Sequence, residues 1–183
     1  MSKENADKEQ KRSFKREAFS WIACIVVTIL LTEFILNFVI INANIPSGSM
    51  ENTIMTNDKL IALRTSYWFN DPKRGDIIIF KYPDDETEWF IKRVIALPGE
   101  TVLVKDGKVY INGSKKALSE PYIKEEPVED FGPYKVPKNG YFVMGDNRNN
   151  SNDAREWETH YVSRDEILGK AWFRYYPSIK AIK

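Results

Sequence analysis

Two short stretches of the sequence carry residues that could do chemistry together. Residues 45–50, with the sequence IPSGSM, place Ser49 on a short turn directly after a long apolar segment. Residues 90–95, with the sequence FIKRVI, place Lys92 in an apolar run, where desolvation disfavours a charged ammonium. A serine hydroxyl is a weak nucleophile unless a base accepts its proton. A lysine can be that base only if burial favours its neutral form.

The identity of the base follows from chemistry and not from periodicity. Alternation along a strand places Lys92 and Arg93 on opposite faces, each among apolar neighbours, so the pattern does not say which cation is buried. Arginine cannot lose its proton in a protein, so only Lys92 could act as the base. The alternatives are that both cations are solvated on an edge strand and that residues 47–49 are only a polar turn.

Two further polar motifs follow the same chain order. Residues 74–76 read RGD, and residues 145–155 read GDNRNNSNDAR, a loop able to form Asx turns and bidentate Arg–carboxylate pairs. Together the four motifs resemble those of bacterial type I signal peptidases, from the apolar segment to the C-terminus. The members of that family are membrane-anchored Ser–Lys proteases that remove signal peptides from exported proteins.

The resemblance implies roles for eight residues. Ser49 would be the nucleophile and Lys92 the general base. The hydroxyl of Ser47 would join the backbone N–H of Ser49 in an oxyanion hole, although Ser47 could also be a simple turn former. Ser151 would hydrogen-bond the lysine and orient it. Four residues would support the site: Asp153 and Arg155 would pair and shape it, while Asp146 and Arg148 would hold the polar loop.

The sequence departs from the family pattern at two places. Asn52 stands where the family often has proline, and residues 96–97 are Ala-Leu where it often has Gly-Leu. Both positions adjoin motifs without being chemical themselves. They therefore bear on local rigidity more than on activity.

The composition narrows the class of protein. A chain of 183 residues is one domain with an appendage, and its net charge of +1 gives no field that would suggest nucleic acid. The single cysteine, Cys24, allows no internal disulfide. With His160 as the single histidine, too few soft ligands remain for a structural zinc site. We therefore expect no metal and no cofactor.

The apolar segment from Ala18 to Ile41 is long enough to span a bilayer as a helix. Glu33 and Asn37 interrupt it, share a helix face and are expected near the outer interface. A cleaved signal peptide would have a shorter apolar region, and a buried core helix would need a larger domain around it. We predict a transmembrane helix over residues 18–42, a basic cytoplasmic tail over 1–17 and an extracytoplasmic domain over 43–183.

The signals of the third region are those of strands. An Asp-Gly pair at 106–107 predicts a hairpin, residues 112–139 read as a polar loop rich in proline, and residues 164–168 as a short helical turn capped by Ser163. The predicted fold is a mainly β, signal-peptidase-like domain on a single transmembrane helix. Strands are expected at residues 60–63, 76–80, 89–97, 101–105, 108–111, 141–144 and 171–176.

The main functional hypothesis is a serine endopeptidase in the cell membrane that cleaves N-terminal signal peptides after small residues at positions −1 and −3. Its partners would be secretory preproteins and the phospholipid bilayer, with no nucleic acid. A self-cleaving repressor-type Ser–Lys peptidase would need a DNA-binding module, and a Ser–His enzyme would need His160, which lies outside the motifs. A non-catalytic β module that binds exported proteins would be free to lose Ser49 or Lys92.

Overall fold

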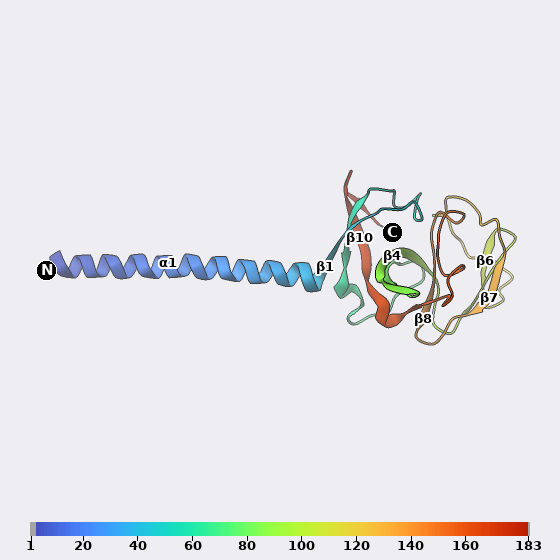
Figure 1. Ribbon diagram of the computed structural model, residues 1–183, viewed down its shortest axis with the longest axis horizontal. Helices are drawn as coiled ribbons and strands as arrows, with labels where there is room; N and C mark the ends of the chain where they lie inside the picture. Colours follow the sequence, from blue (N-terminus) through green and yellow to red (C-terminus); the bar gives the residue numbers. More distant parts are fainter. Residues whose placement is uncertain (1–2, 183) are drawn as a thin grey trace. The chain divides into compact units, whose positions relative to one another are not determined.

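The computed structural model describes residues 3–182, with side chains from Phe14 onward, and the chain divides into two compact units. The first unit is helix α1 (Lys3–Phe34), which continues as a turn of π-helix, η1 (Ile35–Val39). Figure 1 shows α1 as one long continuous helix. By length and composition the 26 residues from Phe14 to Val39 could cross a membrane.

The helix differs from its predicted bounds at both ends. The backbone is already helical at Lys3, inside the predicted tail, while residues 1–2 and the side chains of residues 1–13 lie outside the described part. At the other end the helical segment stops at Val39, because residues 40–44 pair with a strand of the second unit. The interrupting side chains interact, since Asn37 Nδ2 donates to the carbonyl and to the carboxylate of Glu33 at 2.8 and 3.1 Å.

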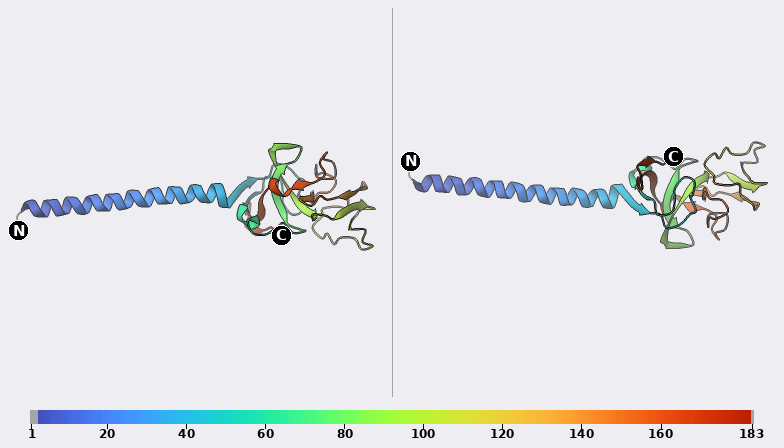
Figure 2. Two further views of the ribbon diagram at one scale, coloured as in Figure 1. Left: turned by 90° about the horizontal axis from the view of Figure 1, so that it is seen from below. Right: turned by 90° about the horizontal axis from the view of Figure 1, so that it is seen from above.

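The second unit is built from two antiparallel sheets. The larger has the strand order β1-β2-β10-β3-β4-β8-β9, with β11 also paired to β10. The smaller has the order β6-β5-β7 and lies at the end of this unit opposite to β1 (Figures 1 and 2). The bounds are β1 (Ile40–Asn44), β2 (Lys59–Leu63), β3 (Ile77–Tyr82), β4 (Asp85–Ala96), β5 (Thr101–Lys105), β6 (Lys108–Ile111), β7 (Phe131–Lys135), β8 (Gly140–Met144), β9 (Val162–Ser163), β10 (Ile167–Tyr176) and β11 (Lys180–Ala181), with short 3₁₀ turns η2 (Arg64–Tyr67) and η3 (Arg164–Glu166).

Two apolar clusters cover opposite faces of the central strands. Ile78 and Phe80 of β3 lie in the larger cluster. Ile77 and Ile79 lie in the other, because alternate side chains of a strand point to opposite faces. The middle of the large sheet is therefore buried on both sides. Lys92 and Arg93 of β4, which pair with Ile78 and Ile77 of β3, are consequently removed from water.

The mainly β fold predicted from the sequence is confirmed, including the hairpin at 106–107 between β5 and β6. The interpretation of residues 112–139 as a polar loop is wrong for residues 131–135, because these form β7 and pair with β5. The helical turn near Ser163 is shorter than predicted and forms η3 alone, with the Ser163 N–H donating to the carboxylate of Glu166 at 2.6 Å.

Candidate active site

Ser49 sits on a turn that is anchored on both sides by buried apolar residues. Ile45 precedes it and Met50 follows it, and both belong to the second apolar cluster. The backbone N–H of Ile45 donates to the carbonyl of Asp58 at 3.0 Å, and that of Ile54 to the carbonyl of Met50 at 2.8 Å. These contacts leave Ser49 only 6% exposed. The sequence thus places the hydroxyl on a rigid turn and not on a loose linker.

Lys92 comes from β4 and reaches the same point from the sheet. It pairs with Ile78 of β3 in the register of the sheet and is only 4% exposed. Its Nζ donates a hydrogen bond to Ser49 Oγ at 2.7 Å, across 43 residues of sequence. The sequence pattern left open which cation of the pair is buried. Both are: Lys92 faces the serine, and Arg93 faces a carboxylate.

Burial changes the acid–base behaviour of Lys92. Desolvation of the ammonium lowers the pKa of Lys92 from 10.5 to about 8. The charge of Arg155 lowers this pKa further, while the carboxylates of Asp153 and Asp146 oppose the shift. At pH 7 roughly one molecule in ten would carry a neutral amine at this position. Such an amine can accept a proton from a hydroxyl 2.7 Å away.

A cavity of about 710 Å³ opens onto this pair. Its lining includes Ser47, whose Oγ lies 3.4 Å from Ser49 Oγ. The wall beside Lys92 is formed by β4 residues Trp89 to Ile91. Strand β8 pairs with β4 only along Arg93 to Ala96, so within the described chain the preceding residues of β4 have no strand on that side. An extended peptide could lie along this open edge.

The RGD motif holds β4 just beyond the lysine. The N–H of Val94 donates to the carbonyl of Asp76 at 2.8 Å, and the N–H of Gly75 donates back to the carbonyl of Val94 at 2.8 Å. Gly75 has a φ of 90°, which glycine adopts without strain. Its carbonyl also accepts a hydrogen bond from the Arg93 guanidinium at 2.8 Å. The motif therefore fixes the strand segment that carries both cations.

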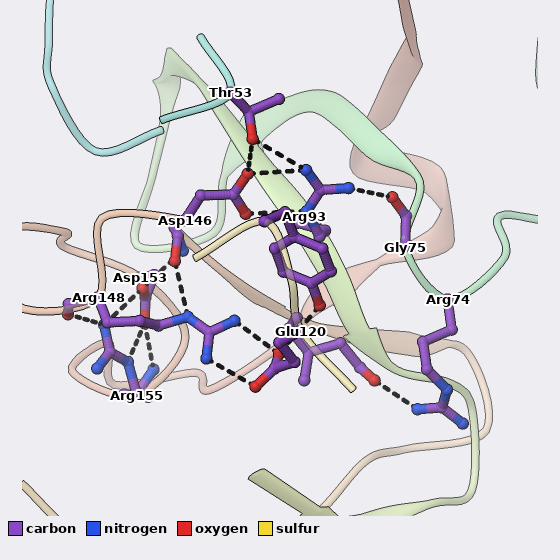
Figure 3. A network of polar contacts seen from close by, with 12 residues as sticks. Thr53, Arg74, Gly75, Arg93, Glu120, Asp146, Arg148, Asp153 and Arg155 are labelled. Carbon is purple, nitrogen blue, oxygen red and sulfur yellow. Dashed lines mark hydrogen bonds and ion pairs between the residues drawn. The ribbon is translucent and has the colours of Figure 1, made fainter. Parts of the chain in front are cut away.

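A buried ion pair joins β4 to the polar loop of residues 145–155. Arg93 donates to both carboxylate oxygens of Asp146, from Nε at 2.9 Å and from Nη2 at 2.7 Å (Figure 3). The Thr53 hydroxyl donates to the same carboxylate. The side chains of Arg93 and Asp146 are 2% and 0% exposed. Removing one partner from such a pair typically costs about 3–5 kcal/mol, because the other charge remains buried.

A second buried pair lies deeper in the loop. Arg155 donates to the two oxygens of Asp153 from Nε at 2.8 Å and from Nη2 at 2.9 Å. The N–H of Gly145 donates to the same carboxylate at 2.9 Å. Gly145 must be glycine, because a Cβ there would collide with the carbonyl of Ser49 and the hydroxyl of Ser151. The loop therefore packs directly against the turn that carries Ser49.

Ser151 has a different partner from the one expected. Its hydroxyl donates to Asp153 Oδ2 at 2.8 Å, and it forms no hydrogen bond with Lys92 among the described residues. The physical reason is that a buried carboxylate competes strongly for a nearby hydroxyl donor. Ser151 nevertheless lines the cavity beside Lys92. We place it as a neighbour of the lysine that is held by Asp153.

Three residues near the site were not identified from the sequence. Asn147 donates from its N–H to the carbonyl of Ser49 at 3.0 Å and from Nδ2 to the carbonyl of Gly48 at 2.9 Å. Glu120 binds both terminal nitrogens of Arg148, and Tyr122 stacks on the guanidinium of Arg93. The only signal for Asn147 is its place in the polar motif.

The alternative base, His160, lies outside the cavity lining. Its Nδ1 is 2.8 Å from the carbonyl of Ala154, and its ring packs on Tyr134. Within the described part of the chain, no group of three or more His, Cys, Asp or Glu side chains is placed to hold a metal ion. The residues that meet at the cavity are of types that can carry out proton transfer and nucleophilic attack.

Known proteins resemble the chain over most of its length. Residues 18–176 match the family described as "Signal peptidase, peptidase S26". The chain is 44% identical over 157 residues to a probable signal peptidase I-2 of Synechocystis sp., covering 83% of this chain and 70% of the relative. It is 46% identical over 164 residues to signal peptidase I of Leptolyngbya laminosa, covering 85% and 78%. Identity to signal peptidase I of Bacillus amyloliquefaciens is 35% over 179 residues, covering 92% and 94%.

Proposed function

Since the chain belongs to the signal peptidase family, peptidase S26, we propose that it cleaves N-terminal signal peptides from exported preproteins with Ser49 and Lys92 as its catalytic dyad. The observation that carries this proposal is the 2.7 Å contact between Lys92 Nζ and Ser49 Oγ. Both side chains are buried, and both line the cavity bordered by the open edge of β4.

The first half of the reaction would form an acyl-enzyme. Neutral Lys92 accepts the proton of the Ser49 hydroxyl, and Ser49 Oγ attacks the scissile carbonyl. The N–H of Ser49 and the hydroxyl of Ser47 donate to the oxyanion that develops. As the tetrahedral intermediate collapses, the Lys92 ammonium gives its proton to the leaving amine, and the mature protein departs. The signal peptide stays bound to Ser49 as an ester.

The second half would return the enzyme to its starting state. Lys92 is neutral again and accepts a proton from water, which attacks the ester carbonyl. Lys92 then protonates Ser49 Oγ as the ester breaks, and the signal peptide leaves with a free carboxylate. Asp153 and Asp146 raise the pKa of Lys92 and Arg155 lowers it, so the two ion pairs tune the base while holding the loop.

The direct experiment uses the purified full-length chain in detergent micelles with a purified preprotein. The wild-type chain should release the mature protein with a new N-terminus after the signal peptide. Ser49→Ala is the matched variant, because it removes one oxygen atom from a turn that Ile45 and Met50 anchor. Equal cleavage by Ser49→Ala and the wild type would contradict the proposal.

The pH dependence of cleavage should report the deprotonation of Lys92. Because the pKa of Lys92 is lowered to about 8, kcat/KM should rise with pH, by roughly tenfold per unit below that value, and level off above it. The check is a rate profile from pH 6 to 10, together with the pH dependence of chemical modification of Lys92 in Ser49→Ala. If Lys92 stays protonated at a pH where the enzyme is fully active, it is not the base.

The location of the reaction follows from the order of the chain. Basic residues such as Lys15 and Arg16 precede the apolar segment that begins at Ala18, and they favour a cytoplasmic N-terminus. Ser49 follows Val39, the last residue of the helical segment, by ten residues, which limits its separation from the helix end to roughly 35 Å. The dyad would then act close to the outer surface of the membrane.

The topology can be tested by protease protection. In intact protoplasts, added protease should digest the unit from Ile40 onward and spare an epitope tag placed before residue 1. Opening the protoplasts should make the tag accessible and serves as the control. A tag that is digested from outside, with the second unit protected, would place the dyad on the wrong side for exported substrates.

A further inference from the structure

Residues 120–124, which we call the strap, lie in the long connection between β6 and β7 and contribute no catalytic group. At its start Glu120 forms a bidentate pair with Arg148, from Nη1 at 3.0 Å and from Nη2 at 2.7 Å (Figure 3). The two side chains are 6% and 0% exposed. Arg148 Nε donates in turn to the carbonyl of Gly145 at 3.0 Å. The strap is therefore fixed to the polar loop beside the dyad.

The middle of the strap reaches the strand that carries Lys92. The ring of Tyr122 lies over the guanidinium of Arg93, 3.9 Å from its centre, and the Tyr122 hydroxyl donates to Glu120 at 3.0 Å. The N–H of Lys124 donates to the carbonyl of Asp146 at 2.9 Å. The strap thus covers the buried pair of Arg93 and Asp146 and joins it to Glu120.

The end of the strap is bound to the turn that carries Ser49. Asn52 Nδ2 donates to the carbonyl of Tyr122 at 2.9 Å and to that of Ile123 at 3.3 Å. Lys124 Nζ donates to the Glu51 carboxylate at 2.9 Å. One five-residue segment therefore contacts all three parts of the chain that supply the candidate active site.

Asn52 has a backbone conformation that suits this contact. Its φ is 91°, a region open to glycine and asparagine and closed to proline, whose ring fixes φ near −65°. This is one of the two positions at which the sequence departs from the pattern that the resemblance implies. A proline here could neither adopt this turn nor donate to the strap. The asparagine supplies both the turn and the donor.

We propose that the strap positions the dyad, and that Asn52 is the positioning residue that ties the Ser49 turn to it. The proposal rests on the function proposed above. Asn147 holds the carbonyls of Gly48 and Ser49 from one side, and Asn52 holds the turn from the other, three residues after the nucleophile. A shift of about 1 Å between reacting groups can cost on the order of 100-fold in rate, so an anchor this close controls kcat.

The test compares two exposed asparagines that both have positive φ. Asn52→Gly keeps the left-handed conformation, since glycine adopts it freely, and removes the two hydrogen bonds to the strap. Asn57→Gly is the matched control, because Asn57 has a φ of 68° and its side chain makes no hydrogen bond among the described residues. Asn52→Asp is a second variant that keeps the shape of the side chain and loses the donor.

Cleavage of a purified preprotein is measured at saturating and limiting substrate and normalised to folded protein. Both Asn52 variants should lower kcat by on the order of tenfold and leave KM within about twofold, because Asn52 does not line the cavity at Ser49. Asn57→Gly should match the wild type. A wild-type kcat in both Asn52 variants, or a change in KM alone, would overturn the strap proposal.

Ser49→Ala is assayed in the same series so that two kinds of failure are separated. If Ser49→Ala is inactive and the Asn52 variants are fully active, the strap proposal fails and the dyad stands. If Ser49→Ala cleaves as well as the wild type, the dyad is wrong and the strap proposal fails with it. A lower kcat in both Asn52 variants, with inactive Ser49→Ala, supports both.

Discussion

Replacing Ser49 or Lys92 with alanine should each lower kcat/KM for preprotein cleavage by on the order of 10⁴-fold, and the double variant should be no worse than either single one. The reason is the 2.7 Å contact between Lys92 Nζ and Ser49 Oγ, which makes the two side chains one chemical unit. Without Lys92 the Ser49 hydroxyl has no base to accept its proton, and without Ser49 the Lys92 amine has no hydroxyl to deprotonate. The measurement is a double-variant cycle on kcat/KM, and additive losses would show that the two residues act separately.

Lys92→Arg distinguishes a base from a simple cation. The guanidinium keeps its proton at every working pH, so this variant should be as inactive as Lys92→Ala. Near-normal activity of Lys92→Arg would mean that position 92 supplies charge and not proton transfer. Retention of the fold is checked by thermal unfolding of each variant in detergent.

Lys92→Met provides a further control. This variant should be catalytically inactive, and its free energy of unfolding at pH 7 should be higher than that of the wild type. Burial lowers the pKa of Lys92 from 10.5 to about 8, so the unfolded chain binds more protons than the folded one between these values, and the stability contributed by Lys92 rises with pH across that window. Below pH 8 the folded chain carries the full free-energy cost of burying the charged ammonium of Lys92. Removing the amine should stabilise the fold by about 1–3 kcal/mol at pH 7, and this gain should shrink toward pH 10.5.

The strands could be predicted wherever apolar side chains dominate a short run. β3 and the second half of β4 are examples, since residues 77–80 and 91–96 are buried and the runs end at turn-forming residues. β7 was missed because Gly132 and Pro133 lie inside it, and both residues weaken a strand signal. The end of the N-terminal apolar helix was misplaced because residues 40–42 are compatible with a helix by composition. Their pairing with β2 depends on partners about 20 residues away in the sequence.

In the candidate site, the residues that would carry out the chemistry could be predicted from the sequence, and the contacts that depend on the folded chain could not. Ser49 and Lys92 could be identified because few residue types can act as nucleophile and base. The partner of Ser151 could not, since a hydroxyl rotates toward the strongest nearby acceptor and Asp153 supplies it. Glu120 gave no signal, because an acid in a polar loop usually faces water. Its buried pairing with Arg148, 28 residues away, is a property of the folded chain.

The residue that precedes the cleaved bond should have to be small. To place its carbonyl at Ser49 Oγ, a substrate lying along the open edge of β4 would set the −1 side chain against Lys92 and its neighbours. The space beside Lys92 is already filled by protein side chains. Lys92 is 4% exposed, its Nζ lies 5.3 Å from the centre of the Phe90 ring, and Ile91 is buried. In an extended chain the −1 and −3 side chains share one face, and the −2 side chain points the other way.

A preprotein series with Ala, Ser, Leu and Phe at −1, −2 and −3 tests this argument. Leu or Phe at −1 should lower kcat/KM by on the order of 100-fold or more relative to Ala, because overpacking displaces the carbonyl from Ser49. Leu or Phe at −3 should also lower kcat/KM relative to Ala. Substitutions at −2 are the internal control and should change kcat/KM little, since the −2 side chain points away from Lys92 and its neighbours. Efficient cleavage behind Leu or Phe would refute the small pocket and leave the Ser–Lys chemistry untouched, because the dyad acts on the carbonyl and not on the side chain beside it.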